Sequence, residues 1–329
     1  MSSMITPAFY NPAQIGSLFY PNMGEISAAA EAAQLPWASA DKKNIHLVLI
    51  DMQVDFCHEQ GNLYVPGSLD DIERVCAFIM RHAANITQIT STLDSHVPFQ
   101  IFHPPWWVDA AGNHPAPFTL IKHQDILDGT WRAVVAEDYS AEYCRLLEAS
   151  ARKVLTIWPY HVLIGGPGNM LDPMLWSMVT WHALARQTQP NWVTKGTLAQ
   201  TENYSAIKPE IPVANHPSMG RAKGFLQSLD SSDLILLAGE AESHCVLATL
   251  ADMVAHFADQ PEKRQQIYVL KDCMSPVQHP EVDFHALALA EFEQFAAQGV
   301  NFINSTDDLP IFQNSQTAPE TAVHGVKMF

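Results

Sequence analysis

Short apolar segments alternate with helical patterns along most of this 329-residue chain. The apolar segments, which predict buried strands, cover 45–50, 86–93, 154–157, 192–194, 234–238, 266–270 and 300–303. Residues with a helical period lie between them, over 68–84, 139–152, 173–187, 242–257 and 280–297. Strands that alternate with helices pair in parallel, because each connection returns across the sheet before the next strand begins. We therefore predict an α/β fold, a doubly wound and mostly parallel sheet with helices on both faces in three α/β/α layers.

The charge and the cysteine content limit the partners and the environment of the chain. Its 18 basic and 35 acidic residues give a formal net charge of −17, which argues against nucleic acids and anionic membranes as partners. No apolar run is long enough to span a bilayer, and residues 1–22 lack the pattern of a secretory signal. The five cysteines are scattered without Cys-x-x-Cys spacing, which indicates neither a disulfide framework nor a cysteine-based zinc site. We expect a cytoplasmic protein.

Differences in composition divide the chain into a main domain and flanking segments. Residues 44–309 carry the alternating pattern and form the predicted domain. Residues 1–43 are rich in Ala, Pro, Ser and Asn and predict an N-terminal extension, which packs either on the domain or on a neighbouring subunit. Residues 310–329 form a polar C-terminal tail. We expect a homo-oligomer.

A cysteine follows one of the predicted strands at the start of a helix. The apolar run 234–238 ends at Gly239, and Cys245 lies in the first turn of the helical pattern that comes next. The free N–H groups and the positive dipole end of a helix favour a thiolate. Cys245 is therefore a candidate nucleophile, provided that a base and a cation reach it. A buried core thiol is the alternative interpretation.

Charged residues follow two other predicted strands. Asp51 comes directly after 45–50, and Lys195 comes directly after 192–194. In a parallel sheet the carboxyl ends of the strands lie at one edge, where functional residues gather. Asp51 could then take the thiol proton, and Lys195 could hold both anions in place. The alternatives are a helix or turn cap for Asp51 and a surface position for Lys195.

One carboxylate and several histidines form a candidate metal site. Asp94 and His96 are two positions apart in an extended segment, so their side chains share a face. His161 could complete the set, and His103 is a possible fourth ligand. These donors suit Zn²⁺, Fe²⁺ or Mn²⁺ with open positions for water or another ligand. The alternative is that these histidines are turn or core residues.

Together these residues lie in motifs that resemble the nicotinamidases, a branch of the isochorismatase-like cysteine hydrolase superfamily. The matches follow the family order from about residue 45 to 305. They are Leu49-Ile-Asp-Met-Gln-Val-Asp-Phe-Cys57, Asp94-Ser-His96, Trp158-Pro-Tyr-His161, Lys195-Gly196 and Ala241-Glu-Ser-His-Cys245-Val246.

The resemblance implies the isochorismatase-like fold and catalytic roles for the matched residues. Asp51 would be the general base and acid, Lys195 its charge partner, and Cys245 the nucleophile. The family has a non-proline cis peptide before the nucleophile, which here would be Glu240–Ala241. The N–H groups of Ala241 and Cys245 would form the oxyanion hole.

The resemblance also implies how the substrate would be held. In nicotinamidases the residues that match Asp94, His96 and His161 bind a metal, which takes the pyridine nitrogen of nicotinamide. Phe56 and Trp158 match the aromatic residues on either side of the pyridine ring, although ordinary core aromatics are the alternative. The isochorismate-cleaving branch lacks the metal site, so these residues favour an amidase.

The chain departs from the family where the substrate would be selected. Asp94 and Trp158 are 64 positions apart, farther than in small nicotinamidases, and the sequence between them predicts an insertion at about 104–152. After Lys195 the aromatic-rich segment of the family is replaced by 197–205, in which Glu202 or Tyr204 could face the pocket.

We predict hydrolysis of a small amide, with nicotinamide to nicotinate and ammonia as the first choice, through a thioester on Cys245 and with a divalent metal. One alternative is another hydrolase of the superfamily, acting on a different amide, a ureido compound or isochorismate. A non-catalytic binding protein is the other.

Overall fold

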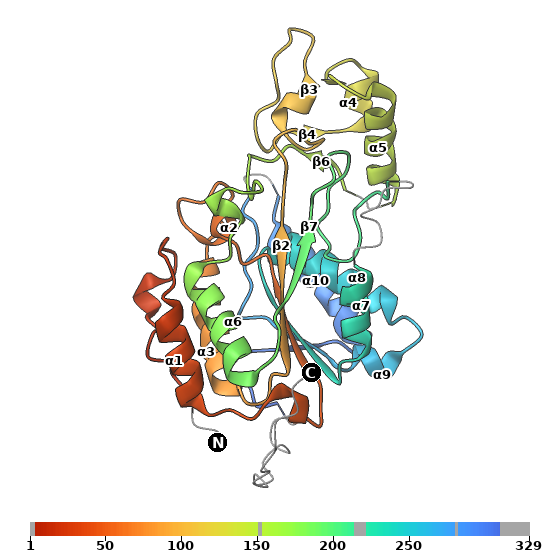
Figure 1. Cartoon of the computed structure of the whole chain (residues 1–329). Coiled ribbons are helices and arrows are strands. Elements are labelled where there is room, and N and C mark those ends of the chain that lie inside the picture. Colours follow the sequence, from red (N-terminus) through yellow and green to blue (C-terminus); the bar gives the residue numbers. More distant parts are fainter. Residues whose placement is uncertain (1–3, 151–152, 214–221, 280–281, 310–329) are drawn as a thin grey trace, which may run out of the picture.

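The protein is a three-layer α/β/α body with a smaller lobe beyond one end of its sheet (Figure 1). The computed structural model describes residues 4–150, 153–213, 222–279 and 282–309. The predicted C-terminal tail at 310–329 lies outside the described residues.

In the described part of the chain, six parallel strands form the central sheet, in the order β10-β9-β8-β1-β2-β7. They are β1 (Ile45–Ile50), β2 (Gln88–Asp94), β7 (Asn191–Lys195), β8 (Leu234–Gly239), β9 (Ile267–Leu270) and β10 (Asn301–Ile303). The strand β1 lies inside the sheet, with β2 on one side and β8 on the other. The predicted α/β fold and doubly wound sheet are confirmed.

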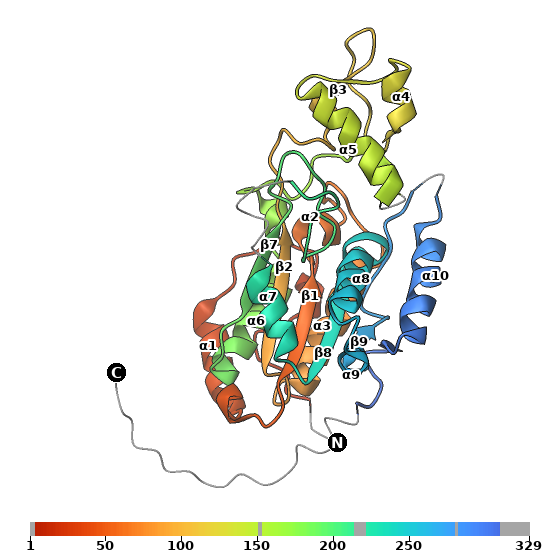
Figure 2. The same cartoon turned by 90° about the vertical axis from the view of Figure 1, so that its right-hand side faces the viewer.

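Helices cover both faces of this sheet (Figures 1 and 2). On one side lie α1 (Met23–Ala33), α3 (Ser68–His82) and α6 (Pro173–Arg186). On the other side lie α7 (Lys223–Asp230), α8 (Leu247–His256), α9 (Pro261–Arg264) and α10 (Phe284–Ala297). Among the described residues, no helix is both long enough and apolar enough to cross a bilayer.

The two helical layers explain which strands are most apolar. Every residue of β1 and of β8 is buried, because helices cover both faces of these inner strands. The helix α3 shows the complementary pattern: Ile72, Val75, Cys76 and Ile79 are buried at the spacing of one helical face. Acidic residues in its first turn and basic residues in its last turn complement its dipole.

A lobe of short elements lies beyond the carboxyl ends of the strands, and we call it the upper lobe (Figures 1 and 2). It contains β3 (Trp107–Val108), β4 (Leu120–Ile121), α4 (His123–Leu127), β5 (Arg132–Ala133), α5 (Glu137–Ser150) and β6 (Leu155–Thr156). The helix predicted over 139–152 is α5. The predicted insertion at 104–152 falls in this lobe, and its boundaries stay a prediction.

One predicted strand belongs to the upper lobe and not to the central sheet. We expected 154–157 to lie in the parallel sheet, but β6 forms an antiparallel pair with β4. The expectation was wrong because an apolar run of four residues fits any buried strand and does not identify its partner.

The N-terminal extension packs on the body of the protein. The helix α1 lies against α6 and buries Ile26 and Ala30 there. Arg186, at the end of α6, is fully buried and binds the carboxylate of Asp41 at 2.5 and 2.6 Å. Its guanidinium also donates to the carbonyl of Pro36. The extension is therefore held by both apolar and charged contacts.

Candidate active site

Four neighbouring strands bring the predicted catalytic residues to one edge of the sheet. Asp51 follows β1, Asp94 ends β2, Lys195 ends β7, and Cys245 follows β8. The order β8-β1-β2-β7 makes these strand ends adjacent. Asp94 and Lys195 are also partners in the pairing of β2 with β7, which places their side chains side by side.

The Lys195 ammonium lies at the centre of this group. Its Nζ is 2.9 Å from Asp51 Oδ2, 3.2 Å from Asp94 Oδ1 and 3.5 Å from Cys245 Sγ. It also donates a hydrogen bond of 2.8 Å to the carbonyl of Asn203. All four side chains are buried. The structure thus brings together the acid, amine and thiol that the sequence predicts.

Thr92 fixes the orientation of Asp51. Its hydroxyl donates to Asp51 Oδ1 at 2.5 Å, and its oxygen accepts the Asp51 N–H at 3.0 Å. Asp51 itself takes the left-handed backbone conformation, with φ +45°. Such a conformation is uncommon for residues other than glycine, so the chain turns sharply at the end of β1 and points this carboxylate toward Lys195.

Cys245 lies in a π-helical turn, which the predicted helix over 242–257 did not anticipate. Residues Glu242–Val246 form this turn, and α8 continues from it. Single π-turns of this kind are rare and occur often at functional sites. The turn keeps Cys245 in the first turn of the helix, as predicted, and within reach of Lys195.

Burial and neighbouring charges act in opposite directions on these groups. Burial raises the pKa of the Cys245 thiol well above its ordinary value, and the Lys195 charge lowers it only in part. Burial also raises the pKa of Asp51, again against the effect of Lys195. For Lys195, burial disfavours the charged form, but Asp51 and Asp94 outweigh it and raise its pKa. The resting site therefore holds a charged amine and a protonated thiol.

The peptide bond before the nucleophile turn is trans. We expected a cis peptide at Glu240–Ala241, and this expectation was wrong, since the described residues contain no cis peptide. Gly239 makes the turn instead, with φ +130°. The N–H of Glu240 then donates to the carbonyl of Ile50, and the N–H of Glu242 donates to the carbonyl of Ser275. The peptide bond between Glu240 and Ala241 stays trans, the isomer of lower free energy.

The predicted metal ligands Asp94, His96 and His161 also come together. Each offers one ligand atom, and these atoms lie within 4.8 Å of one another. The Nδ1 atom of His96 is 3.1 Å from the carbonyl of Gly196, and that of His161 is 2.7 Å from the carbonyl of Pro159.

These carbonyls favour a proton on Nδ1 of each ring and so leave Nε2 as the donor atom for a metal. Burial lowers the pKa of His161 to about 3, so this imidazole is neutral at pH 7, the form that binds metals. The donor set therefore fits a divalent metal.

His103 lies beside this group but outside it. Its ring centre is 6.1 Å from that of His96 and 6.5 Å from that of His161. The Nδ1 atom faces the carbonyl of Pro98 at 3.2 Å, and the buried Nε2 atom has no hydrogen-bond partner among the described residues. Its role as a fourth ligand stays a prediction.

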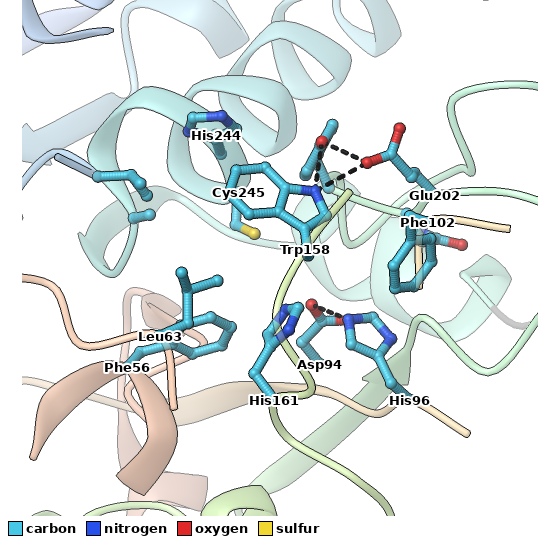
Figure 3. Close-up of a pocket in the computed structure, with 14 residues that line it drawn as sticks. Phe56, Leu63, Asp94, His96, Phe102, Trp158, His161, Glu202, His244 and Cys245 are labelled. Carbon is cyan, nitrogen blue, oxygen red and sulfur yellow. Dashed lines mark hydrogen bonds and ion pairs between the residues drawn. The ribbon is translucent and has the colours of Figure 1, made fainter. Parts of the chain in front are cut away.

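A pocket joins the thiol to the candidate metal ligands (Figure 3). Phe56 and Trp158, the predicted ring-binding residues, line it together with Asp94, His96, His161, Ala241 and Cys245. The Phe56 ring centre is 5.4 Å from that of His161. In Figure 3 the side chains of Asp94, His96 and His161 lie below the Trp158 indole, and the thiol of Cys245 lies within 4.8 Å of a carboxylate oxygen of Asp94.

Sequence reasoning missed several residues that build this site. Thr92, which holds Asp51, is one of them, and so is Gln53, whose amide binds both backbone groups of Asp94 at 2.7 and 2.8 Å. Gln53 lies two positions after Asp51 in the first motif, which could have identified it. Glu202 and Tyr204 were expected as alternatives, and both line the pocket.

Solved structures share this fold at low sequence identity. The yeast nicotinamidase Pnc1p, bound to the inhibitor nicotinaldehyde, is 18% identical, with a TM-score of 0.54 over 79% of this chain and 99% of that chain. A nicotinamidase/pyrazinamidase from Acinetobacter baumanii is 20% identical, with a TM-score of 0.52 over 81% and 98% of the two chains. No protein-family model matches the chain, and no curated protein does. The likeness establishes the isochorismatase-like α/β fold.

Proposed function

We propose that this protein is a metal-assisted cysteine amidase that acts on a small amide, with nicotinamide as the leading candidate. The observation that carries the proposal is the position of Lys195, whose Nζ lies within 3.5 Å of the Cys245 thiol and of two carboxylates. A buried acid, amine and thiol in contact form a set that can activate a nucleophile. The fold shared with two nicotinamidases supports the same assignment.

In the proposed reaction, Asp51 accepts the proton of the Cys245 thiol, and Lys195 stabilises the thiolate that forms. The sulfur attacks the amide carbon, and the oxyanion accepts hydrogen bonds from the N–H groups of Ala241 and Cys245. Ala241 is suited to this role because its N–H donates no hydrogen bond to the described residues. Each such donor contributes ~10²–10³ in rate.

Asp51 then returns the proton to the leaving ammonia, which leaves a thioester on Cys245. Water, with Asp51 again as the base, hydrolyses this thioester and restores the thiol. Asp51 can serve both steps because Thr92 holds its carboxylate in one orientation between Lys195 and Cys245.

Asp94, His96 and His161 would hold the metal, which when bound polarises an oxygen or nitrogen ligand as a Lewis acid. His161→Ala removes one ligand, so we expect the purified variant to lose stoichiometric metal by elemental analysis. His182→Ala is a matched control, because His182 is also buried and its ring binds backbone carbonyls, among them that of Ile86, and not the candidate metal ligands. Equal metal content in both variants would contradict this site.

Replacing the nucleophile tests the proposal directly. Cys245→Ala removes the sulfur, and we expect ammonia release from nicotinamide to stop while the circular dichroism spectrum is unchanged. Cys76→Ala is the control, since Cys76 is a buried core thiol in α3. An unchanged rate in Cys245→Ala would overturn the proposal. If the unmodified protein releases no ammonia from nicotinamide but does from another amide, the substrate is wrong and the chemistry stands.

A further inference from the structure

A hydrogen-bonded set of three side chains forms the pocket wall opposite the candidate metal ligands (Figure 3). Glu202 Oε1 accepts the indole N–H of Trp158 at 3.0 Å and the hydroxyl of Tyr204 at 2.5 Å. Glu202 is only 2% exposed. One buried carboxylate oxygen therefore satisfies two donors of the wall.

The upper lobe holds Glu202 in place. Tyr143, on α5, is buried, and its hydroxyl accepts the backbone N–H of Glu202 at 3.0 Å. One turn earlier on α5, Tyr139 donates its hydroxyl to the carbonyl of Gln200 at 3.0 Å. Two tyrosines of one helix thus support the segment that carries Glu202.

The indole of Trp158 depends on this support for its orientation. Trp158 lies in the chain just after β6 and outside the central sheet, so no strand fixes it. Its ring makes edge contacts with Phe118, His161 and His244, with ring centres 5.5 to 6.5 Å apart. Edge contacts permit some rotation of a ring, whereas a hydrogen bond to a buried carboxylate defines its plane.

We propose that Glu202 is the positioning residue that fixes the Trp158 indole in the pocket, and that the upper lobe fixes Glu202 through Tyr143. The inference rests on the proposed function in that Trp158 is taken as a wall against which a flat amide ring binds. The upper lobe then helps to determine the shape of the substrate pocket, in addition to covering it.

Two substitutions at Glu202 separate a positioning role from other roles. Glu202→Gln keeps an acceptor oxygen, whereas Glu202→Leu removes the acceptor of the Tyr204 hydroxyl and leaves the Trp158 indole only the longer contact of 3.2 Å to the Tyr204 oxygen. We expect Glu202→Leu to raise the KM for nicotinamide by roughly tenfold, with a smaller change in kcat, and Glu202→Gln to restore most of the loss. Equal losses in the two variants would mean that the charge matters and would overturn the proposal.

A spectroscopic measurement tests the same point without turnover. In protein labelled with ¹⁵N-tryptophan, the indole N–H signal of Trp158, assigned by its absence in Trp158→Phe, reports its hydrogen bond. We expect it to shift and to exchange faster in Glu202→Leu and to stay close to its original position in Glu202→Gln. If nicotinamide is not the substrate, this measurement still decides the positioning role. An unmoved signal in Glu202→Leu would refute it.

The role of the lobe has its own test, which also serves if Glu202→Leu fails to fold. Tyr143→Phe removes one hydroxyl of the lobe and leaves the pocket side chains in place. We expect the Trp158 signal to move away from its wild-type position and the KM to rise. Glu137→Gln is the control on the same helix, because Glu137 is exposed and its carboxylate pairs with Arg132, outside the pocket. If the Trp158 signal and the KM of Tyr143→Phe match those of Glu137→Gln, the upper lobe does not position Glu202, and that part of the proposal is overturned.

Discussion

Removing the charge of Lys195 tests whether that charge activates the thiol. Lys195→Met keeps an unbranched chain of similar length but has no charge. The wild-type Nζ lies 3.5 Å from Cys245 Sγ in a buried site. With an effective dielectric constant of about 20, a unit charge at that distance attracts a thiolate by roughly 5 kcal/mol. We expect kcat/KM to fall by about 10³-fold, since ~1.4 kcal/mol corresponds to a factor of ten.

Alkylation of Cys245 measures the same effect without a substrate. Iodoacetamide reacts with thiolates, and mass spectrometry of the Cys245 peptide gives the rate at each pH. Burial raises the pKa of Cys245 and Lys195 lowers it, so Lys195→Met should raise that pKa and move the alkylation profile to higher pH. A folded Lys195→Met protein with an unchanged profile, or with kcat/KM within tenfold of wild type, would refute the reasoning.

The substitution also leaves two buried carboxylates without their cation. Breaking a buried ion pair from one side costs about 3–5 kcal/mol, so Lys195→Met should unfold at a lower urea concentration. The double variant Asp51→Asn with Lys195→Met removes one of the two negative charges and is the matched control. We expect it to recover part of the stability and none of the activity, which separates loss of folding from loss of chemistry.

Three further predictions concern residues around this centre. Gly196→Ala should abolish activity and lower the melting temperature, because Gly196 has φ +77° and an added Cβ would lie 2.2 Å from Asp94 Oδ1; normal melting would contradict this. Thr92→Val should cost about 1–3 kcal/mol in the free energy of unfolding and lower kcat, since it deprives Asp51 of two hydrogen bonds; kcat equal to wild type would argue against the orienting role. Burial raises the pKa of Glu202 from 4.5 to about 7 in the folded protein. As pH rises, the Glu202 carboxyl therefore loses its proton in the unfolded chain before it does so in the folded protein. The free energy of unfolding of the wild type should then fall between pH 4.5 and about pH 7. Glu202→Gln lacks this loss and should gain about 3 kcal/mol over wild type between pH 4 and pH 8 in urea titrations, whereas a constant difference would contradict the assignment.

The central sheet could be predicted from the sequence because its inner strands are buried on both faces. Such strands are continuous apolar runs, and β1 and β8 stand out for that reason. Asp51 and Cys245 could be identified because they follow the ends of these two strands. Lys195 could be grouped with them because the carboxyl ends of parallel strands lie at one edge of the sheet. Local patterns and one topological rule were enough for this part of the site.

The rest of the site depends on contacts that no local pattern encodes. Glu202 lies in a segment without periodicity, and its partner Trp158 comes from beyond the upper lobe, 44 positions away in sequence. The trans peptide before Ala241 and the π-turn around Cys245 follow from how Gly239 and its neighbours bind the ends of other strands. Such features are set by packing between distant segments, so the family resemblance predicted one of them wrongly.

The pairing of Asp94 with Lys195 across β2 and β7 has a consequence for how this chain tolerates changes in length. Successive residues of a strand point to opposite faces, so deleting one residue inside either strand would turn a charged side chain away from the thiol and toward a helical layer. Additions between strands carry no such penalty, as the long excursion between β2 and β7 illustrates. Single-residue deletions should therefore abolish activity when they fall within β2 or β7 and reduce it little when they fall in the connections between strands.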